Sequence, residues 1–259
     1  MTRTYVVTGA ASGIGKTLAE RLIQEGSTVI GVDLHNTDVN VDLTTDEGRT
    51  ALVEQVTEIS GGKIDGIAAL AGLAAPIPAT VGVNYFGMIA TLEGLRPLLA
   101  GSSAPRAALA ASEAILDPSD EELVKALADG DEDAALARAA VLASDTAGSN
   151  PIYSSTKIAI ALWTKKNAPT DAWAGASIPL NAIAPGLIAT PMINDILATE
   201  EGRAALVASA PSPLNGPVAP ATAPAALLHW LISEENTHVT GQIIFIDGGG
   251  EAIRRPDMV

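Results

Sequence analysis

The chain has no cysteine among its 259 residues, so disulfides, a thiolate nucleophile and a thiolate metal site are all excluded. Aromatic residues make up only 3% of the sequence, and aliphatic residues dominate instead. This balance is typical of buried parallel strands covered by helices. The three histidines, His35, His229 and His238, have no neighbouring ligand types at metal-binding spacing. We therefore expect no metal site.

Positive charge is also scarce. The sequence has 15 Lys and Arg residues against 30 Asp and Glu residues, a formal net charge of −15. The resulting field repels phosphate, which argues against binding to nucleic acid or to an anionic membrane surface. No apolar run reaches the length of a membrane span, and the first residues form a strand rather than a signal segment. We expect a soluble, cytoplasmic protein.

The N-terminal part of the sequence predicts a nucleotide-binding unit. A β-branched strand at 4–8 leads into a glycine turn at 9–15, a helix at 16–25 and a second strand at 28–32. Such a turn exposes backbone N–H groups at the positive end of the helix dipole, where a pyrophosphate can bind. Asp33 lies about 20 residues beyond the turn, where a carboxylate that accepts the ribose hydroxyls is expected.

Strands continue to alternate with helices along the chain. The remaining predicted strands span 39–41, 64–70, 107–111, 177–184 and 242–246, and the remaining helices span 46–60, 80–99, 153–167 and 221–233. This alternation predicts an α/β fold over one domain, residues 1–259: a Rossmann-type doubly wound parallel sheet with helices on both faces. Right-handed crossovers then place ligands at the carboxyl ends of the strands.

Two stretches depart from the alternation. Residues at about 117–143 are acidic and predict an inserted helical hairpin, with a capping box from Ser119 to Glu122 at its start. Residues at about 187–218 combine apolar helical fragments with prolines, which is typical of a loop over a pocket. The apolar side chains of 187–197 favour an apolar substrate, and no cation there could hold a carboxylate or a CoA phosphate.

Tyr153 and Lys157 lie four residues apart, on one face of a predicted helix. A free tyrosine titrates at about 10, which is too high for proton exchange at neutral pH. A neighbouring ammonium favours the phenolate and lowers that pKa, so the pair suits general acid–base chemistry on an alcohol or ketone. By itself, such a pair is also typical of ordinary surface neighbours on a helix.

The wider context of this pair is specific. The motifs occur in the order Thr8-Gly9-x-x-x-Gly13-Ile14-Gly15, Val83-Asn84-Tyr85-Phe86-Gly87, a strand-end serine, Tyr153-x-x-x-Lys157 and Pro185-Gly186-x-x-x-Thr190-Pro191. This set resembles the short-chain dehydrogenase/reductase family over essentially the whole chain. Within the family, the asparagine motif, the helical insertion and the Ile246-Asp247-Gly248-Gly249 ending are most similar to the bacterial 3α-hydroxysteroid dehydrogenase/carbonyl reductase branch.

The resemblance implies four catalytic roles. Tyr153 transfers the proton, and Lys157 lowers its pKa and binds the nicotinamide ribose. Ser112 donates a hydrogen bond to the substrate oxygen, and Asn84 holds a water that links Lys157 to solvent. The residues expected to bind substrate are Ser112, Tyr153, Leu187, Met192, Ile193 and Ile196.

The expected cofactor is NAD(H) rather than NADP(H). Asp33 would bind both ribose hydroxyls and repel a 2′-phosphate, and no basic residue occupies 10–14, although Lys16 in the first helical turn opposes this choice. The residues expected to bind the cofactor are Gly9, Ser12, Gly13, Ile14, Gly15, Asp33, Leu34, Asp42, Leu43, Ala71, Gly72, Tyr153, Lys157, Pro185, Gly186, Ile188 and Thr190. By the resemblance, Thr190 and the backbone of Ile188 hold the carboxamide.

The sequence departs from the family pattern in two places. Ala69-Leu70-Ala71-Gly72 stands where members usually show Asn-Asn-Ala-Gly, so the hydrogen bonds of the asparagine are missing. The serine usually lies about a dozen residues before the tyrosine, where this chain has Ala140. Ser112 is favoured because it follows an apolar strand. Its rivals are Ser144 and Ser149, and a role for Ser112 as a helix cap stays open.

Together these features predict an NAD(H)-dependent oxidoreductase that interconverts a secondary alcohol and a ketone by hydride transfer, with Tyr153 as general acid/base. The expected substrate is an apolar cyclic, aromatic or steroid-like molecule. The alternatives are a non-steroid cyclic alcohol dehydrogenase of the same family and a non-catalytic dinucleotide-binding redox sensor. Family members usually form homodimers or homotetramers, and an insertion that covers one helix face predicts a dimer through the last strand and helix.

Overall fold

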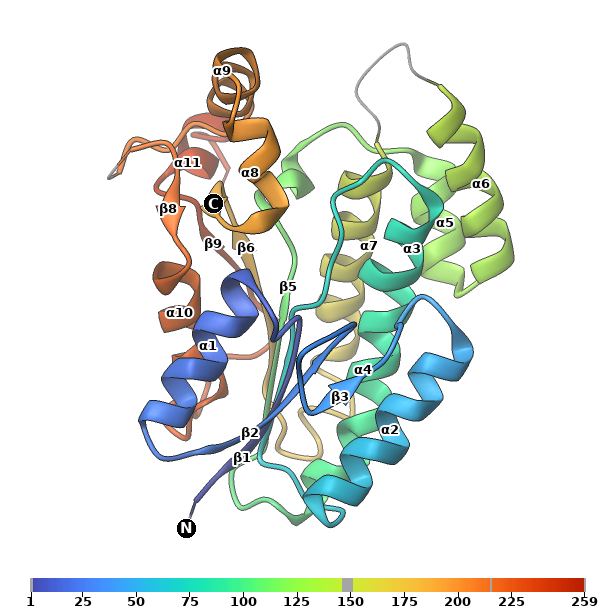
Figure 1. Ribbon diagram of the computed structural model, residues 1–259, viewed down its shortest axis with the longest axis vertical. Coiled ribbons are helices and arrows are strands. Elements are labelled where there is room, and N and C mark those ends of the chain that lie inside the picture. Colours follow the sequence, from blue (N-terminus) through green and yellow to red (C-terminus); the bar gives the residue numbers. More distant parts are fainter. Residues whose placement is uncertain (1, 146–150, 215, 259) are drawn as a thin grey trace.

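The computed structural model describes residues 2–145, 151–214 and 216–258 and is built around a seven-stranded parallel sheet (Figure 1). The strand order is β3-β2-β1-β4-β5-β6-β9. The strands are β1 (Thr4–Thr8), β2 (Thr28–Asp33), β3 (Val39–Asn40), β4 (Gly66–Ala69), β5 (Arg106–Ala110), β6 (Leu180–Pro185) and β9 (Ile243–Ile246). The order reverses between β1 and β4, and ligands of such sheets bind at the carboxyl ends beside this reversal. The predicted α/β fold is confirmed.

Helices cover both faces of the sheet (Figure 1). One face carries α1 (Gly13–Gln24) and α10 (Thr222–Ile232), and the other carries α2 (Asp46–Ser60), α4 (Met88–Leu95) and α7 (Ile152–Asn167). Each face has its own apolar cluster. Leu18 and Leu228 are buried in one and Leu52 and Ile160 in the other, so the sheet is sealed on both sides.

Helix α2 shows how closely local signals can fix an element. Thr45 caps it by accepting a hydrogen bond from the Gly48 N–H at 3.1 Å, and Asp46 and Glu47 follow in the first turn, where acids suit the helix dipole. Gly61 ends it in the left-handed conformation, with φ of 64°. The helix predicted at 46–60 is confirmed.

The helix predicted at 80–99 is instead a series of four segments. A short α3 (Pro78–Val81) leads into a π-helical turn (Gly82–Gly87), then α4, then a 3₁₀ turn (Arg96–Gly101). Pro97 lacks the N–H that a further α-helical turn needs, so the chain tightens there. Hydrophobic periodicity shows none of these changes of pitch.

The acidic insertion forms a helical hairpin, as predicted. It consists of α5 (Glu121–Asp129) and α6 (Glu132–Ser144), joined at Gly130, which has a positive φ of 73°. The hairpin packs against α7 and α3 and lies on the outer side of the molecule (Figure 1).

The start of the hairpin differs from the prediction. The cap is Asp120, not Ser119: Asp120 Oδ1 accepts the Leu123 N–H at 2.8 Å. Arg138 Nη2 also donates to Asp120 Oδ2 at 2.6 Å, and this guanidinium holds the pKa of Asp120 below its usual range. The two oxygens of a carboxylate accept the Leu123 N–H and the guanidinium fork of Arg138 together, which the single oxygen of a serine cannot do, and this favours a cap one residue later.

The loop predicted at 187–218 contains more structure than expected. It holds α8 (Pro191–Leu197), α9 (Glu200–Ser209) and β7 (Ile188–Ala189), which pairs with β8 (Ala219–Pro220) just beyond it. An unpredicted short helix, α11 (Gly250–Arg254), follows β9. Within the described part of the chain, no helix is both long and apolar enough to cross a bilayer.

Candidate active site

A cavity of about 530 Å³ lies at the carboxyl ends of the strands. Every residue expected to bind the cofactor lines it. Of the residues expected to bind substrate, Ser112, Tyr153, Leu187, Met192 and Ile193 line it too, and the side chain of Ile196 lies outside the described residues. The structure thus gathers segments from both halves of the sequence around one space.

The glycine turn at one end of the cavity has no room for side chains. A Cβ on Gly15 would lie 2.2 Å from the Gly9 carbonyl oxygen, and Gly9 itself has a positive φ of 72°. Ser12 precedes α1 without a side-chain cap, and no acid occupies the first helical turn. The first N–H groups of this helix are therefore available to an anion, so the turn fits a pyrophosphate.

Asp33 is fixed beside this turn. Its Oδ2 accepts the Ala11 N–H at 3.0 Å and its Oδ1 accepts the Leu34 N–H at 2.7 Å. Each carboxylate oxygen has a further lone pair, so both can still accept a hydroxyl. The geometry therefore fits a ribose diol at this strand end.

The end of β4 is held without the missing asparagine. The Thr8 hydroxyl accepts the N–H groups of Leu70 and Ala71, at 2.9 and 3.0 Å. Thr8 can do this because it ends β1, the neighbouring strand in the sheet. Thr8 therefore holds the end of β4 against β1.

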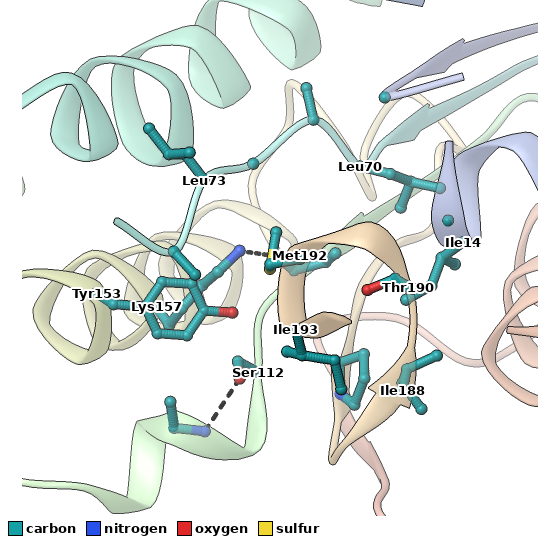
Figure 2. A pocket seen from close by; sticks show the side chains of 18 of the residues that line it. Ile14, Leu70, Leu73, Ser112, Tyr153, Lys157, Ile188, Thr190, Met192 and Ile193 are labelled. Carbon is teal, nitrogen blue, oxygen red and sulfur yellow. Dashed lines mark hydrogen bonds between the residues drawn. The ribbon is translucent and has the colours of Figure 1, made fainter. Parts of the chain in front are cut away.

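At the other end of the cavity, Tyr153 and Ser112 meet from different elements (Figure 2). Tyr153 projects from the first turn of α7, and Ser112 follows β5 by two residues. The Ser112 hydroxyl lies close enough to the phenol to lower its pKa. Across the cavity, Met192 and Ile193 of α8 face them. The phenol is therefore directed into the cavity, beside a second hydroxyl and opposite an apolar wall.

Lys157 is buried one turn along α7. Its Nζ donates to the Ala110 carbonyl at 2.8 Å and lies 5.6 Å from the centre of the Tyr153 ring. Burial lowers the pKa of Lys157 to about 8. The ammonium is thus still the main form at neutral pH, and it loses its proton at a pH slightly above neutral.

The pKa of Tyr153 differs from the sequence-based expectation. Burial raises it, the neighbouring Ser112 hydroxyl acts in the opposite direction, and the Asp117 carboxylate adds to the rise. Lys157 does not offset this rise. The phenol of the cofactor-free protein is therefore protonated at neutral pH.

Asn84 lies behind the cavity wall and is fully buried. Its Nδ2 donates to the Leu73 carbonyl at 2.9 Å and to Thr156 Oγ1 at 3.2 Å, and its Oδ1 accepts the Leu73 N–H at 2.8 Å. A Cβ on Gly72 would come within 3.2 Å of Asn84 Oδ1 and 3.8 Å of Lys157 Nζ. Gly72 thus separates the amide from the ammonium.

The structure also bears on the choice of serine. Ser112 lines the cavity and also caps the following 3₁₀ turn by accepting the Ala114 N–H at 3.1 Å, so the two interpretations are compatible. Ser144 is exposed at the end of α6, where its hydroxyl donates to Val141. Ser149 lies outside the described residues.

Part of the cavity lining was not predicted from the sequence. The additional residues at the substrate end include Glu113, Asp117, Leu206, Ser209, Ala210 and Arg254. Glu113 directly follows the predicted serine, which was a usable signal. Arg254 gave none, because the helix that carries it follows the last strand and was not predicted. Among the described residues, no group of three or more potential metal ligands comes together.

The fold and the arrangement of this cavity are those of a dinucleotide-binding oxidoreductase. A family model described as short chain dehydrogenase matches residues 3–122, and one described as Enoyl-(Acyl carrier protein) reductase matches residues 122–251. The chain belongs to the short-chain dehydrogenase/reductase family.

Individual relatives agree with this assignment. The chain is 32% identical to 3-alpha-hydroxysteroid dehydrogenase/carbonyl reductase of Comamonas testosteroni, over 97% of each chain. It is 30% identical to coniferyl-alcohol dehydrogenase of a Pseudomonas species, over 95% of this chain and 96% of that one. The crystal structure of the 3-alpha-hydroxysteroid dehydrogenase from Pseudomonas sp. B-0831, complexed with NADH, superposes with a TM-score of 0.88 at 32% identity. It covers 99% of this chain and 100% of the other.

Proposed function

We propose that this protein is an NAD(H)-dependent oxidoreductase that interconverts a secondary alcohol and a ketone on an apolar cyclic, aromatic or steroid-like substrate. The observation that supports this most directly is the cavity itself. Its one end is a glycine turn beside Asp33, and its other end holds the Tyr153 and Ser112 hydroxyls with the Lys157 ammonium behind them.

The cofactor preference rests on charge. Asp33 would hold the adenosine ribose and repel a 2′-phosphate. Lys16, the residue that opposes this choice, is exposed on α1, where its Nζ lies 3.9 Å from Glu20 and does not line the cavity. When bound, NAD(H) supplies or accepts the hydride, and its oxidised ring carries a positive charge. The NADH complex of the Pseudomonas relative is consistent with this preference.

In ketone reduction, the protein's task is to deliver a proton to the developing alkoxide. Tyr153 holds that proton on its phenol oxygen, since its pKa lies above the ordinary value of a tyrosine. Ser112 donates a hydrogen bond to the same substrate oxygen, where charge develops. In the reverse direction, the phenolate accepts the proton, which a positively charged nicotinamide favours.

Lys157 and Asn84 support this exchange. Lys157 orients the nicotinamide ribose and remains cationic below a pKa of about 8. Asn84 fixes the Leu73 backbone, and its Oδ1 keeps one lone pair, which we infer holds the water that links Lys157 to solvent. The amide thus acts as a positioning group.

The apolar wall supports the substrate class. Leu187, Met192, Ile193 and Leu206 line the side of the cavity that α8 and α9 cover. Such a cover excludes water and favours flat apolar molecules. The relatives' names are consistent with this class, since they refer to a hydroxysteroid and to coniferyl alcohol.

The test measures the reduction of a panel of steroidal, cyclic and aryl ketones by the oxidation of NADH. The same ketones are tested with NADPH in parallel. We expect turnover of at least one ketone class, with a clear preference for NADH. Binding of NADH without turnover of any ketone would favour the redox-sensor alternative. Equal use of NADPH would contradict the role of Asp33.

We also propose a homodimer through β9 and α10. The hairpin of α5 and α6 packs against α7, so this face of α7 is not free for a second copy. Sedimentation velocity should give a dimer, and a tetramer would contradict this arrangement.

A further inference from the structure

The substrate end of the cavity has one polar corner in its apolar wall, formed by Glu113, Asp117 and Arg254. Arg254 Nη2 donates to Asp117 Oδ1 at 2.6 Å, and Arg254 Nη1 lies 3.8 Å from Glu113 Oε1. These contacts join α11 to the turn after β5, so the corner adjoins the proposed reaction centre at Ser112.

Glu113 is the most unusual group of this corner. It is only 3% exposed, yet neither carboxyl oxygen has a hydrogen-bond partner. Burial raises its pKa to about 7, Asp247 and Asp117 repel its charge, and Arg254 acts in the opposite direction. A buried carboxyl without partners is costly, so its presence at the edge of the cavity needs an explanation.

Arg254 supplies the donors. A guanidinium has five N–H groups, and Asp117 takes one of them by a hydrogen bond. Among the described residues that line the cavity, Lys157 and Arg254 are the cations, and Lys157 donates to the Ala110 carbonyl. Arg254 is therefore the charged donor available to a substrate at this end.

We propose that Arg254, held in place by Asp117 and Glu113, binds a second, uncharged oxygen of the substrate, a hydroxyl or keto group remote from the reacting carbon. This inference rests on the proposed function and adds a specificity-determining residue to it. The oxygen is uncharged because the two acids already balance the guanidinium, so a substrate carboxylate meets no net positive charge.

The test compares three ketones: cyclohexanone, 4-hydroxycyclohexanone and 4-oxocyclohexanecarboxylate. For the unmodified protein, we expect kcat/KM for the hydroxyketone to exceed that for cyclohexanone by about tenfold, the value of one hydrogen bond to a charged donor. For 4-oxocyclohexanecarboxylate, kcat/KM should not exceed the value for cyclohexanone. In Arg254→Met, the ratio should fall to about one, and in Arg254→Lys it should be intermediate, because the single ammonium keeps charge but not the fork geometry.

The matched control is Arg255→Met. Arg255 is the next residue, is bonded to Glu251 at 2.9 Å and does not line the cavity, so this variant should keep the ratio. A second measurement avoids turnover: with NAD⁺ present, cyclohexane-1,4-diol should raise the melting temperature more than cyclohexanol does, and Arg254→Met should abolish the difference. If Arg254→Met does not fold, Arg254→Lys carries both measurements.

The outcomes separate the two proposals. A ratio that Arg254→Met leaves unchanged, or a carboxylate preferred above both other ketones, overturns the inference while the proposed function stands. If no ketone is reduced but cyclohexane-1,4-diol still raises the melting temperature more than cyclohexanol does, and Arg254→Met abolishes this difference, the proposed function fails and the subsite stands. If the unmodified protein neither reduces a ketone nor shows the additional rise in melting temperature with the diol, both proposals are overturned.

Discussion

The two ends of the cavity are built differently. The cofactor end comes from contiguous sequence, in which strand, glycine turn, helix and carboxylate follow one another within about 30 residues, the usual length of such a unit. The substrate end is assembled from the turn after β5, from α8 and α9, and from α11, which lie far apart along the chain. The first end depends on backbone that admits no side chain, and the second on side chains that different elements bring together.

The largest effect is expected at the proposed proton donor, Tyr153. Tyr153→Phe should keep NADH binding and lose about 10³-fold in turnover, because the proton donor is gone while the ring still fills its place. Binding is measured by NADH fluorescence and turnover by NADH oxidation. Tyr85→Phe is the control, since Tyr85 is buried away from the cavity. Retained turnover would remove Tyr153 from its role.

At the cofactor end, Gly15→Ala should weaken NADH binding by about 100-fold, roughly 3 kcal/mol, because the new Cβ would overlap the Gly9 carbonyl and displace the turn. Titration calorimetry measures the change. Gly26→Ala is the control: Gly26 has a positive φ of 87° but open space around it. That variant should lose about 1 kcal/mol of stability and keep its affinity, which separates backbone strain from damage to the turn.

A smaller effect is expected from charge at the same end. Asp33→Asn should weaken NADH about tenfold and narrow the preference over NADPH, because an amide accepts the ribose hydroxyls poorly and no longer repels a 2′-phosphate. Asp38→Asn, whose carboxylate accepts the Gly31 N–H outside the cavity, should leave both affinities unchanged. An unaltered preference in Asp33→Asn would place cofactor selection elsewhere.

At the substrate end, Glu113→Gln should stabilise the protein by about 1 kcal/mol at pH 8 and not at pH 4. The folded pKa of Glu113 is about 7, above its ordinary value of 4.5, so the folded state binds more protons between these values. The unmodified protein therefore loses stability as the pH rises through this window. The Glu113→Gln variant has no proton to lose at this position and does not. Urea unfolding at both pH values measures the difference, and a less stable variant at pH 8 would show that Glu113 is paired as a carboxylate.

The same contrast explains what the sequence could predict. Gly9, Gly15 and Asp33 have roles set by neighbours within one short unit, and the helix at 46–60 carries its own cap and stop signals. The hairpin was predicted for similar reasons, although the bidentate pairing of Asp120 with Arg138 moved its start by one residue.

The features that the sequence did not predict depend on contacts between residues far apart in the chain. The pKa of Tyr153 reflects burial beneath elements that are remote in sequence, and it rises where the neighbouring lysine alone predicted a fall. The π-helical turn that holds Asn84, which donates to Thr156, and the corner at Arg254 likewise involve contacts between residues far apart in the sequence. No periodicity or spacing along the chain encodes these contacts.

The Thr8 hydroxyl, which holds two successive N–H groups of the neighbouring strand end, has a consequence for how this protein tolerates change. Valine has nearly the same outline as threonine, so Thr8→Val would preserve shape while leaving both amides without an acceptor. A single hydroxyl oxygen accepts both N–H groups, so the end of β4 depends on one side chain of the neighbouring strand.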